Sequence, residues 1–161
     1  MSVSSAEHVV RDSIQTQAMP VLVMEDIEAL DLSMIKLKLQ DKEEGQGWDS
    51  GTCNAVELEY KRFLALKRAY PEYEIVPNRA VDTFWHQHIL DTEKYAADCD
   101  ALFGAFLHHF PYFGMRGEQD YADLCQAFSD TQHLYEQHFG SMVDPGRSTK
   151  CRTKCKPVKC K

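Results

Sequence analysis

The sequence has no long run of apolar residues. Unbroken apolar runs such as residues 21–24 are far shorter than the roughly 20 apolar residues of a membrane-spanning helix, so no membrane partner is expected. The first twenty residues also lack the apolar stretch of a secretory signal, because Glu7, Arg11 and Asp12 interrupt it. We therefore expect a cytoplasmic protein, in which cysteines are thiols rather than disulfides.

Several motifs of enzyme active sites are missing. The chain has eight glycines and no glycine-rich phosphate loop, so no nucleotide cofactor is indicated. It also has no serine nucleophile elbow and no pair of carboxylates at a recognisable catalytic spacing. These absences leave open whether the protein is an enzyme.

The composition is that of an ordinary soluble domain. The chain has 161 residues, of which 43% are hydrophobic and 27% charged, which excludes a disordered chain, a collagen-like fibre and a coiled-coil rod. No alternating run of β-branched residues indicates a strand. We therefore predict an all-α fold, a single compact domain of about five helices followed by a flexible basic tail that contains cysteines.

Apolar spacing and capping residues give the expected boundaries. Asn78 and Thr92 are suited to begin helices, and Gly140 to end one. We expect a loose arm over residues 1–20, a helical domain over 21–143 and a tail over 144–161. The predicted helices cover residues 33–45, 54–70, 79–90, 93–110 and 118–139.

The charge is unevenly distributed. Residues 147–161 hold seven basic residues and no acidic one, so the net charge of −7 leaves −14 on the first 146 residues. An acidic body repels nucleic acid, so nucleic-acid binding is not expected except through the tail.

Four of the seven histidines lie in two short segments, residues 81–88 and 106–111. Neutral imidazole is a common ligand of Zn, Cu and Fe ions, and an antiparallel helix pair would bring the two segments together. The sequence therefore predicts a transition-metal site for a Zn, Cu or Fe ion, with Asp82 as a ligand or as the partner of one. The candidate ligands are His86, His88, His108, His109 and Asp82.

Helix geometry limits this set. His86 and His88 point about 200° apart on a regular helix, so both cannot easily reach one ion. His88 shares the apolar face with Phe84 and Trp85, whereas His86 lies over Asp82. The alternative interpretation is that His88 and His109 are core histidines whose nitrogens already have partners.

A catalytic interpretation uses some of the same residues without a metal. His86 could act as a general base oriented by Asp82, or Cys99 could act as a nucleophile. Cys99 shares an apolar stripe with Tyr95 and Leu102, however, so a buried and inert thiol is the default expectation.

Several short segments together resemble a known family. They are residues 59–64 (EYKRFL), 76–77 (VP), 81–90 with its D-x-x-W-H-x-H string, 95, 98–99 (DC), 103–104 (FG) and 108–111 (HHFP). Over roughly residues 25–140 the chain resembles the glycine-rich domain-containing protein-like family of plants and bacteria, as a bacterial member without the glycine-rich region. For plant members with added segments the family implies RNA binding or stress signalling. The present chain lacks a glycine-rich segment, so we do not transfer RNA binding or stress signalling to any of its residues.

The tail spaces its thiols as C-x3-C-x4-C, at Cys151, Cys155 and Cys160. Basic neighbours favour the thiolate, which binds soft metals and is readily modified. The tail could thus be a thiol site, the substrate of a modifying enzyme or protein partner, or a basic arm for nucleic acid. The absence of aromatic residues for base stacking ranks the last interpretation lowest.

The leading hypothesis is a small helical metal-binding protein with an accessory thiol tail. The alternatives are a non-catalytic interaction domain with structural histidines, and a metal- or cysteine-dependent modifying enzyme whose substrate the sequence does not identify.

Overall fold

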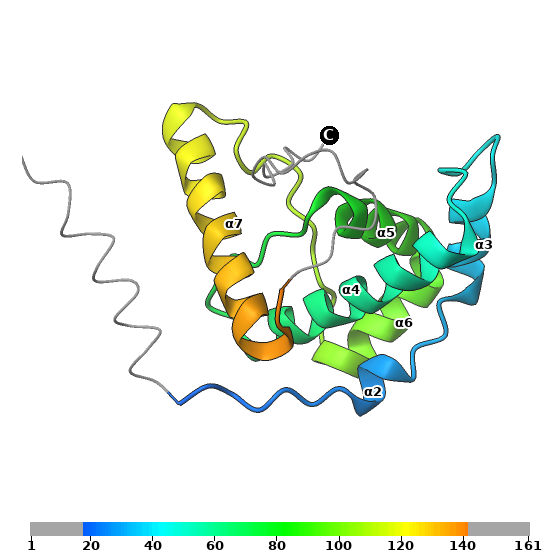
Figure 1. Cartoon of the computed structure of the whole chain (residues 1–161), viewed down its shortest axis with the longest axis horizontal. Helices are drawn as coiled ribbons and strands as arrows, with labels where there is room; N and C mark the ends of the chain where they lie inside the picture. Colours follow the sequence, from blue (N-terminus) through cyan, green and yellow to red (C-terminus); the bar gives the residue numbers. More distant parts are fainter. Residues whose placement is uncertain (1–17, 142–161) are drawn as a thin grey trace, which may run out of the picture.

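The computed structural model describes residues 18–141 and is all-α in this range, as predicted, with no strand and with six helices where about five were expected (Figure 1). None of these helices is both long and apolar enough to cross a membrane. The helices are α2 (Glu25–Glu28), α3 (Ser33–Gln40), α4 (Ser50–Ala69), α5 (Arg79–Leu90), α6 (Thr92–Phe103) and α7 (Glu118–Phe139).

Two predicted segments fall outside this range. Of the arm over residues 1–20 only the last three residues are described, and the tail with Cys151, Cys155 and Cys160 is not described at all. The predictions for the arm and the tail therefore stay predictions.

Helix α4 crosses the middle of the domain and contacts α2, α3 and α5 (Figure 1). It begins before the predicted Asn54, because the Asp49 carboxylate accepts a 2.6 Å hydrogen bond from the Thr52 amide and caps the helix inside a glycine- and serine-containing segment. It ends just before Pro71, as predicted. Its apolar stripe is buried, with Val56, Tyr60, Phe63 and Leu64 all in the core.

Helix α3 is shorter than predicted. It ends at Gln40 rather than near Gly45, because the Asp41 carboxylate accepts hydrogen bonds from the amides of Glu43 and Glu44 and stabilises a turn there. Trp48 packs against the core after this turn.

Helix α5 has the predicted boundaries. The Asn78 side chain accepts a 2.9 Å hydrogen bond from the Val81 amide and caps the helix. The buried face of α5 packs on α4, where the rings of Phe84 and Tyr60 lie 5.0 Å apart. This packing fixes the rotation of α5, and therefore which of its histidines point outward.

Helix α6 is the main departure from prediction, because it ends at Phe103 rather than at Phe110. Gly104 adopts φ +68°, in the left-handed region, and its amide donates to the Asp100 carbonyl. Residues 104–117 then form an irregular connection that carries His108 and His109. Phe106 is half exposed on this connection instead of continuing the buried stripe of α6.

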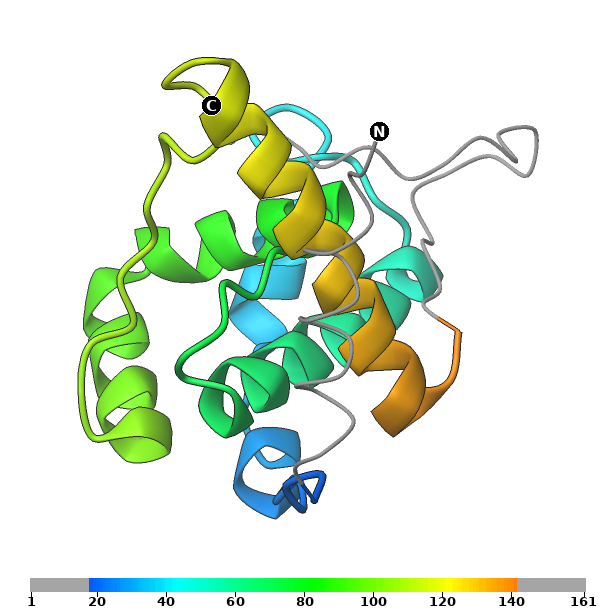
Figure 2. The same cartoon turned by 90° about the vertical axis from the view of Figure 1, so that its left-hand side faces the viewer.

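Helix α7 has the predicted boundaries and lies beside α4 and the connection over residues 70–78 (Figure 2). Leu124, Phe128 and Leu134 of α7 are buried, and polar contacts also attach the helix. The Val76 amide donates to Thr131 Oγ1 at 2.9 Å, the Tyr135 hydroxyl donates to Glu59, and Arg62 donates to the Tyr135 hydroxyl at 2.8 Å.

Candidate metal centre

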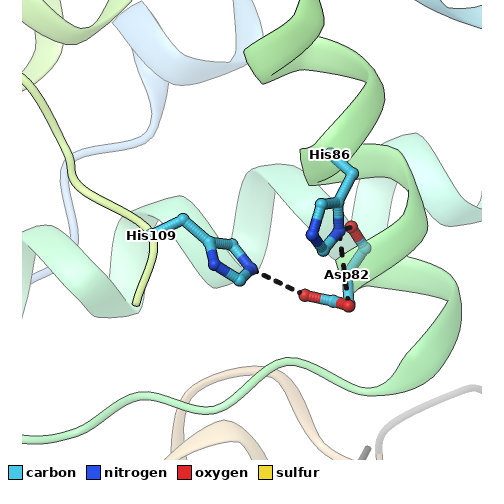
Figure 3. A group of neighbouring side chains, drawn as sticks. All are labelled: Asp82, His86 and His109. Atoms are coloured by element: carbon cyan, nitrogen blue, oxygen red, sulfur yellow. Dashed lines mark hydrogen bonds and ion pairs between the residues drawn. The ribbon is translucent and has the colours of Figure 1, made fainter. Parts of the chain in front are cut away.

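Asp82, His86 and His109 form a compact group, which we call the metal triad (Figure 3). One ligand-type atom from each residue lies within 4.8 Å of those of the other two. His109 Nε2 is 3.1 Å from Asp82 Oδ1, and His86 Nδ1 is 3.4 Å from Asp82 Oδ2. This is the one group of at least three ligand-type residues found within residues 18–141.

Two elements supply the triad. Asp82 and His86 lie one turn apart on α5, so the helix repeat places both side chains on one face. His109 comes from the connection after α6. Its ring packs on the Trp85 indole, with ring centroids 4.3 Å apart, and the Tyr95 hydroxyl holds the Leu107 carbonyl two residues earlier.

The triad lies at the border between the interior and solvent. The side chains of Asp82 and His109 are each 9% exposed, whereas that of His86 is 40% exposed. The Asp82 main-chain carbonyl lies 2.7 Å from His86 Nδ1 and can only accept, so Nδ1 carries the proton. In the neutral imidazole, His86 Nε2 then holds a lone pair, as in metal-binding histidines whose other nitrogen donates to a carbonyl.

The spacing of His109 and Asp82 within the triad is suited to a metal ion. Ligand atoms about 2.1 Å from one ion lie about 3.0–3.4 Å apart when the angle at the ion is between octahedral and tetrahedral. The 3.1 Å distance between His109 Nε2 and Asp82 Oδ1 falls in this range. Two imidazoles and a carboxylate also leave coordination positions for a further ligand.

His88 belongs to a different cluster. Its Nδ1 lies 2.8 Å from the Tyr60 hydroxyl and its Nε2 lies 2.8 Å from Asp98 Oδ2, so both ring nitrogens have protein partners. The side chain is 2% exposed. Burial lowers the pKa of His88, although the neighbouring Asp98 carboxylate acts in the opposite direction. These contacts are those of a core histidine.

His108 lies next to the triad but does not join it. Its ring packs on Phe106, with centroids 4.9 Å apart, and borders a cavity. Among the thiols, Cys99 is buried beside Tyr95 and Leu102, as predicted. Two consecutive histidines on an irregular segment point in different directions, which explains why only one of them reaches Asp82.

A cavity of about 420 Å³ adjoins the triad and shares His109 with it. Its wall also contains Lys67 from α4, Trp85 from α5, and Arg116 and Phe113 from the connection after α6. The sequence did not predict this cavity. The one signal that could have indicated the cavity was a lysine at a position facing the core.

Comparisons with known proteins locate the chain in one family. Residues 27–132 match the family described as UCP032817-like, an interval that contains the whole triad. No curated protein and no solved structure matches the chain. The matching family does not carry the glycine-rich name, so that resemblance stays a prediction. Because the match spans well over half of the sequence, the chain belongs to the UCP032817-like family.

Proposed function

We propose that the protein binds one divalent transition-metal ion, Zn²⁺, Cu²⁺ or Fe²⁺, through Asp82, His86 and His109. The observation that carries the proposal is the shared carboxylate. Asp82 meets His86 of its own helix and His109 from 27 residues further along the chain. Imidazole and carboxylate together suit these ions better than Mg²⁺ or Ca²⁺, which prefer oxygen ligands throughout.

Three protein ligands favour a reactive ion over a structural one. Structural zinc sites use four protein ligands, whereas catalytic sites keep a position for water or substrate. The cavity beside His109 supports this assignment, because it supplies space for a small molecule next to the ion. An ion at this place would act as a Lewis acid on a ligand atom that enters from the cavity.

The arrangement also supports a second candidate function, a non-catalytic interaction domain. Both histidines already have hydrogen-bond partners in the triad, at the Asp82 carboxylate and main-chain carbonyl, so it is chemically satisfied without an ion. The buried contacts of His88 show that this chain uses a histidine as a core residue. Metal affinity distinguishes the two functions.

The experiment is a titration of the untagged, metal-stripped full chain with Zn²⁺ and Co²⁺ by calorimetry and absorption spectroscopy. Cys151, Cys155 and Cys160 are replaced by Ser, because their thiolates would otherwise bind the same ions. We expect one equivalent to bind, with a Co²⁺ spectrum free of thiolate charge-transfer bands. The chain with its natural cysteines is titrated in parallel and tests the proposed accessory thiol site.

The variants Asp82→Asn, His86→Ala and His109→Ala should each weaken binding by at least about tenfold. His133→Ala is the matched control, since His133 is an exposed histidine on α7 outside the triad. Far-ultraviolet circular dichroism confirms that each variant is folded. Absence of a stoichiometric ion, or equal affinity in folded His109→Ala protein, would leave the interaction domain as the better assignment.

A further inference from the structure

The cavity beside the triad combines apolar walls with one unusual cation. Ile75 and Val76, from the connection before α5, line it together with Phe113 and Leu124. A volume of about 420 Å³ lies within the range of small-molecule sites, which are mostly apolar with a few polar groups that fix orientation.

Lys67 is the cation. Its ammonium lies 5.8 Å from the centroid of the Trp85 ring and 6.0 Å from that of Phe63. It forms no ion pair with any carboxylate of residues 18–141 within 4.0 Å, although the charge of Glu74 acts on it from a greater distance. Burial lowers the pKa of Lys67. A partly buried cation without an ion-pair partner favours an anionic ligand.

The other charges of the wall are those of Glu74 and Arg116, and the Glu74 carboxylate lies more than 4.0 Å from the Lys67 ammonium. Arg116 is paired with Asp120 at 2.7 Å, so its charge is compensated from outside the cavity. The first 146 residues carry a net charge of −14, which makes a cation inside a cavity a local exception to the charge of the body. Among the described residues of the wall, Lys67 is therefore the cation without an ion pair, and apolar side chains line the cavity beside it.

We propose that this cavity binds a small organic anion with an apolar body, whose carboxylate pairs with Lys67 while its apolar part lies against Val76, Phe113 and Leu124. Trp85 connects the proposed anion site to the triad, since its ring contacts both the Lys67 ammonium and the His109 imidazole. The site is formed by side chains that need no metal, so the proposal stands apart from the proposed function.

The test uses the fluorescence of Trp85 in the full chain. Trp48→Phe leaves Trp85 as the only tryptophan, and EDTA removes metal. The probes are phenylacetate and hexanoate, compared with phenylacetamide and hexanamide, which have the same shapes without the charge. We expect a saturable change with each anion and at least about tenfold weaker binding of each amide. Acetate should also bind weakly, because it lacks the apolar body.

Two lysine variants assign the charge. Lys67→Met keeps the length and apolar character of the side chain and should weaken phenylacetate binding by about tenfold or more. Lys42→Met is the matched control, because Lys42 is exposed outside the cavity. Near-ultraviolet circular dichroism verifies the packing of both variants.

Three results would overturn the proposal. They are the absence of saturable binding of either anion, equal binding of anions and amides, and unchanged affinity in folded Lys67→Met protein. Equal binding of acetate would show that charge alone is recognised, which also contradicts an apolar ligand body. Because metal is removed throughout, a negative metal titration does not affect these outcomes.

Discussion

The Tyr95 hydroxyl donates a 2.6 Å hydrogen bond to the main-chain carbonyl of Leu107, two residues before His109. The same hydroxyl accepts a 2.9 Å hydrogen bond from the Trp85 indole nitrogen. One buried side chain of α6 therefore fixes both the segment that carries His109 and the ring on which His109 packs. Tyr95 is thus a positioning residue for the triad.

Tyr95→Phe removes both hydrogen bonds and adds no bulk. We expect the free energy of unfolding to fall by about 2–4 kcal/mol, because a buried carbonyl and a buried indole N–H lose their partner. Metal affinity should fall by about tenfold, the cost typical of losing a residue that orients a ligand. Urea unfolding and the calorimetric titration measure the two effects. Tyr112→Phe is the control, because Tyr112 is exposed on the same connection.

Metal should raise thermal stability if the folded triad binds it and the unfolded chain does not. At a free ion concentration of about 100 times the dissociation constant, the gain is about 2.7 kcal/mol, or an increase of about 5–10 °C in Tm. Differential scanning calorimetry of the chain with the tail cysteines replaced by Ser checks this value. An equal shift in His109→Ala protein would show that the ion binds elsewhere.

Two glutamates on α4 should give opposite pH dependences. Burial raises the pKa of Glu59, although Tyr135 and Arg62 contact its carboxylate. Burial also acts to raise the pKa of Glu57, but Lys36 and Lys61 outweigh it and hold that pKa below its ordinary value. Glu59 thus keeps its proton to higher pH in the folded state than in the unfolded state, and Glu57 loses its proton at lower pH.

The stability difference between the natural protein and each Gln variant tests these signs. Relative to Glu59→Gln, the natural protein should lose stability as pH rises from 4.5 through the raised pKa, because an unfavourable buried charge then forms. Relative to Glu57→Gln, it should lose stability as pH falls below 4.5, because its ion pairs disappear. Urea unfolding between pH 3.5 and 7 measures both differences, and slopes of the same sign would contradict the assignment.

Asp120 does not line the cavity but stabilises a segment of its wall. Its carboxylate accepts hydrogen bonds from the amides of Gly114 and Arg116 and pairs with the Arg116 side chain, which lowers the pKa of Asp120 to about 2. Asp120→Ala should weaken phenylacetate binding about threefold or more, through loss of the ordered wall, and leave metal affinity within about twofold. Because the carboxylate stays ionised down to about pH 2, the effect should be the same at pH 5 and pH 8.

The control for Asp120 lies on the same helix. Asp123 accepts a 2.8 Å hydrogen bond from the Gln119 side chain and is exposed, so Asp123→Ala should leave both affinities unchanged. A loss of metal affinity in Asp120→Ala equal to its loss of phenylacetate affinity would mean that the whole connection, rather than the cavity wall, depends on Asp120.

The regular elements followed directly from local sequence signals. The Asn78 cap, the apolar face of α5 and the glycine after α7 each depend on residues within one or two turns, so spacing alone identified them. The start of α4 and the ends of α3 and α6 were the exceptions, and the departure was largest for α6. An apolar stripe continued through Phe106, but the left-handed conformation of Gly104 ended the helix first.

Only the part of the triad that lies within one helix could be predicted from the sequence. The i, i+4 spacing placed His86 over Asp82, a relationship internal to one helix. Which of His108 and His109 faces Asp82 depends on an irregular segment, and that direction is set by Tyr95 and Trp85 through tertiary contacts. No period in the sequence encodes such contacts, and the same applies to the cavity around Lys67.

The polar attachment of α7 has a consequence for partial unfolding. Helices α2, α3 and α5 pack closely on α4, whereas α7 is joined to the body by the contacts of Thr131 and Tyr135 and by its buried apolar side chains. Within residues 18–141, no other helix backbone lies as close to α7 as those of α2, α3 and α5 lie to α4, so we expect α7 to open locally and its amide protons to exchange with solvent earlier. Because Leu124 of α7 borders the cavity, each such opening event would also give small molecules a route in and out.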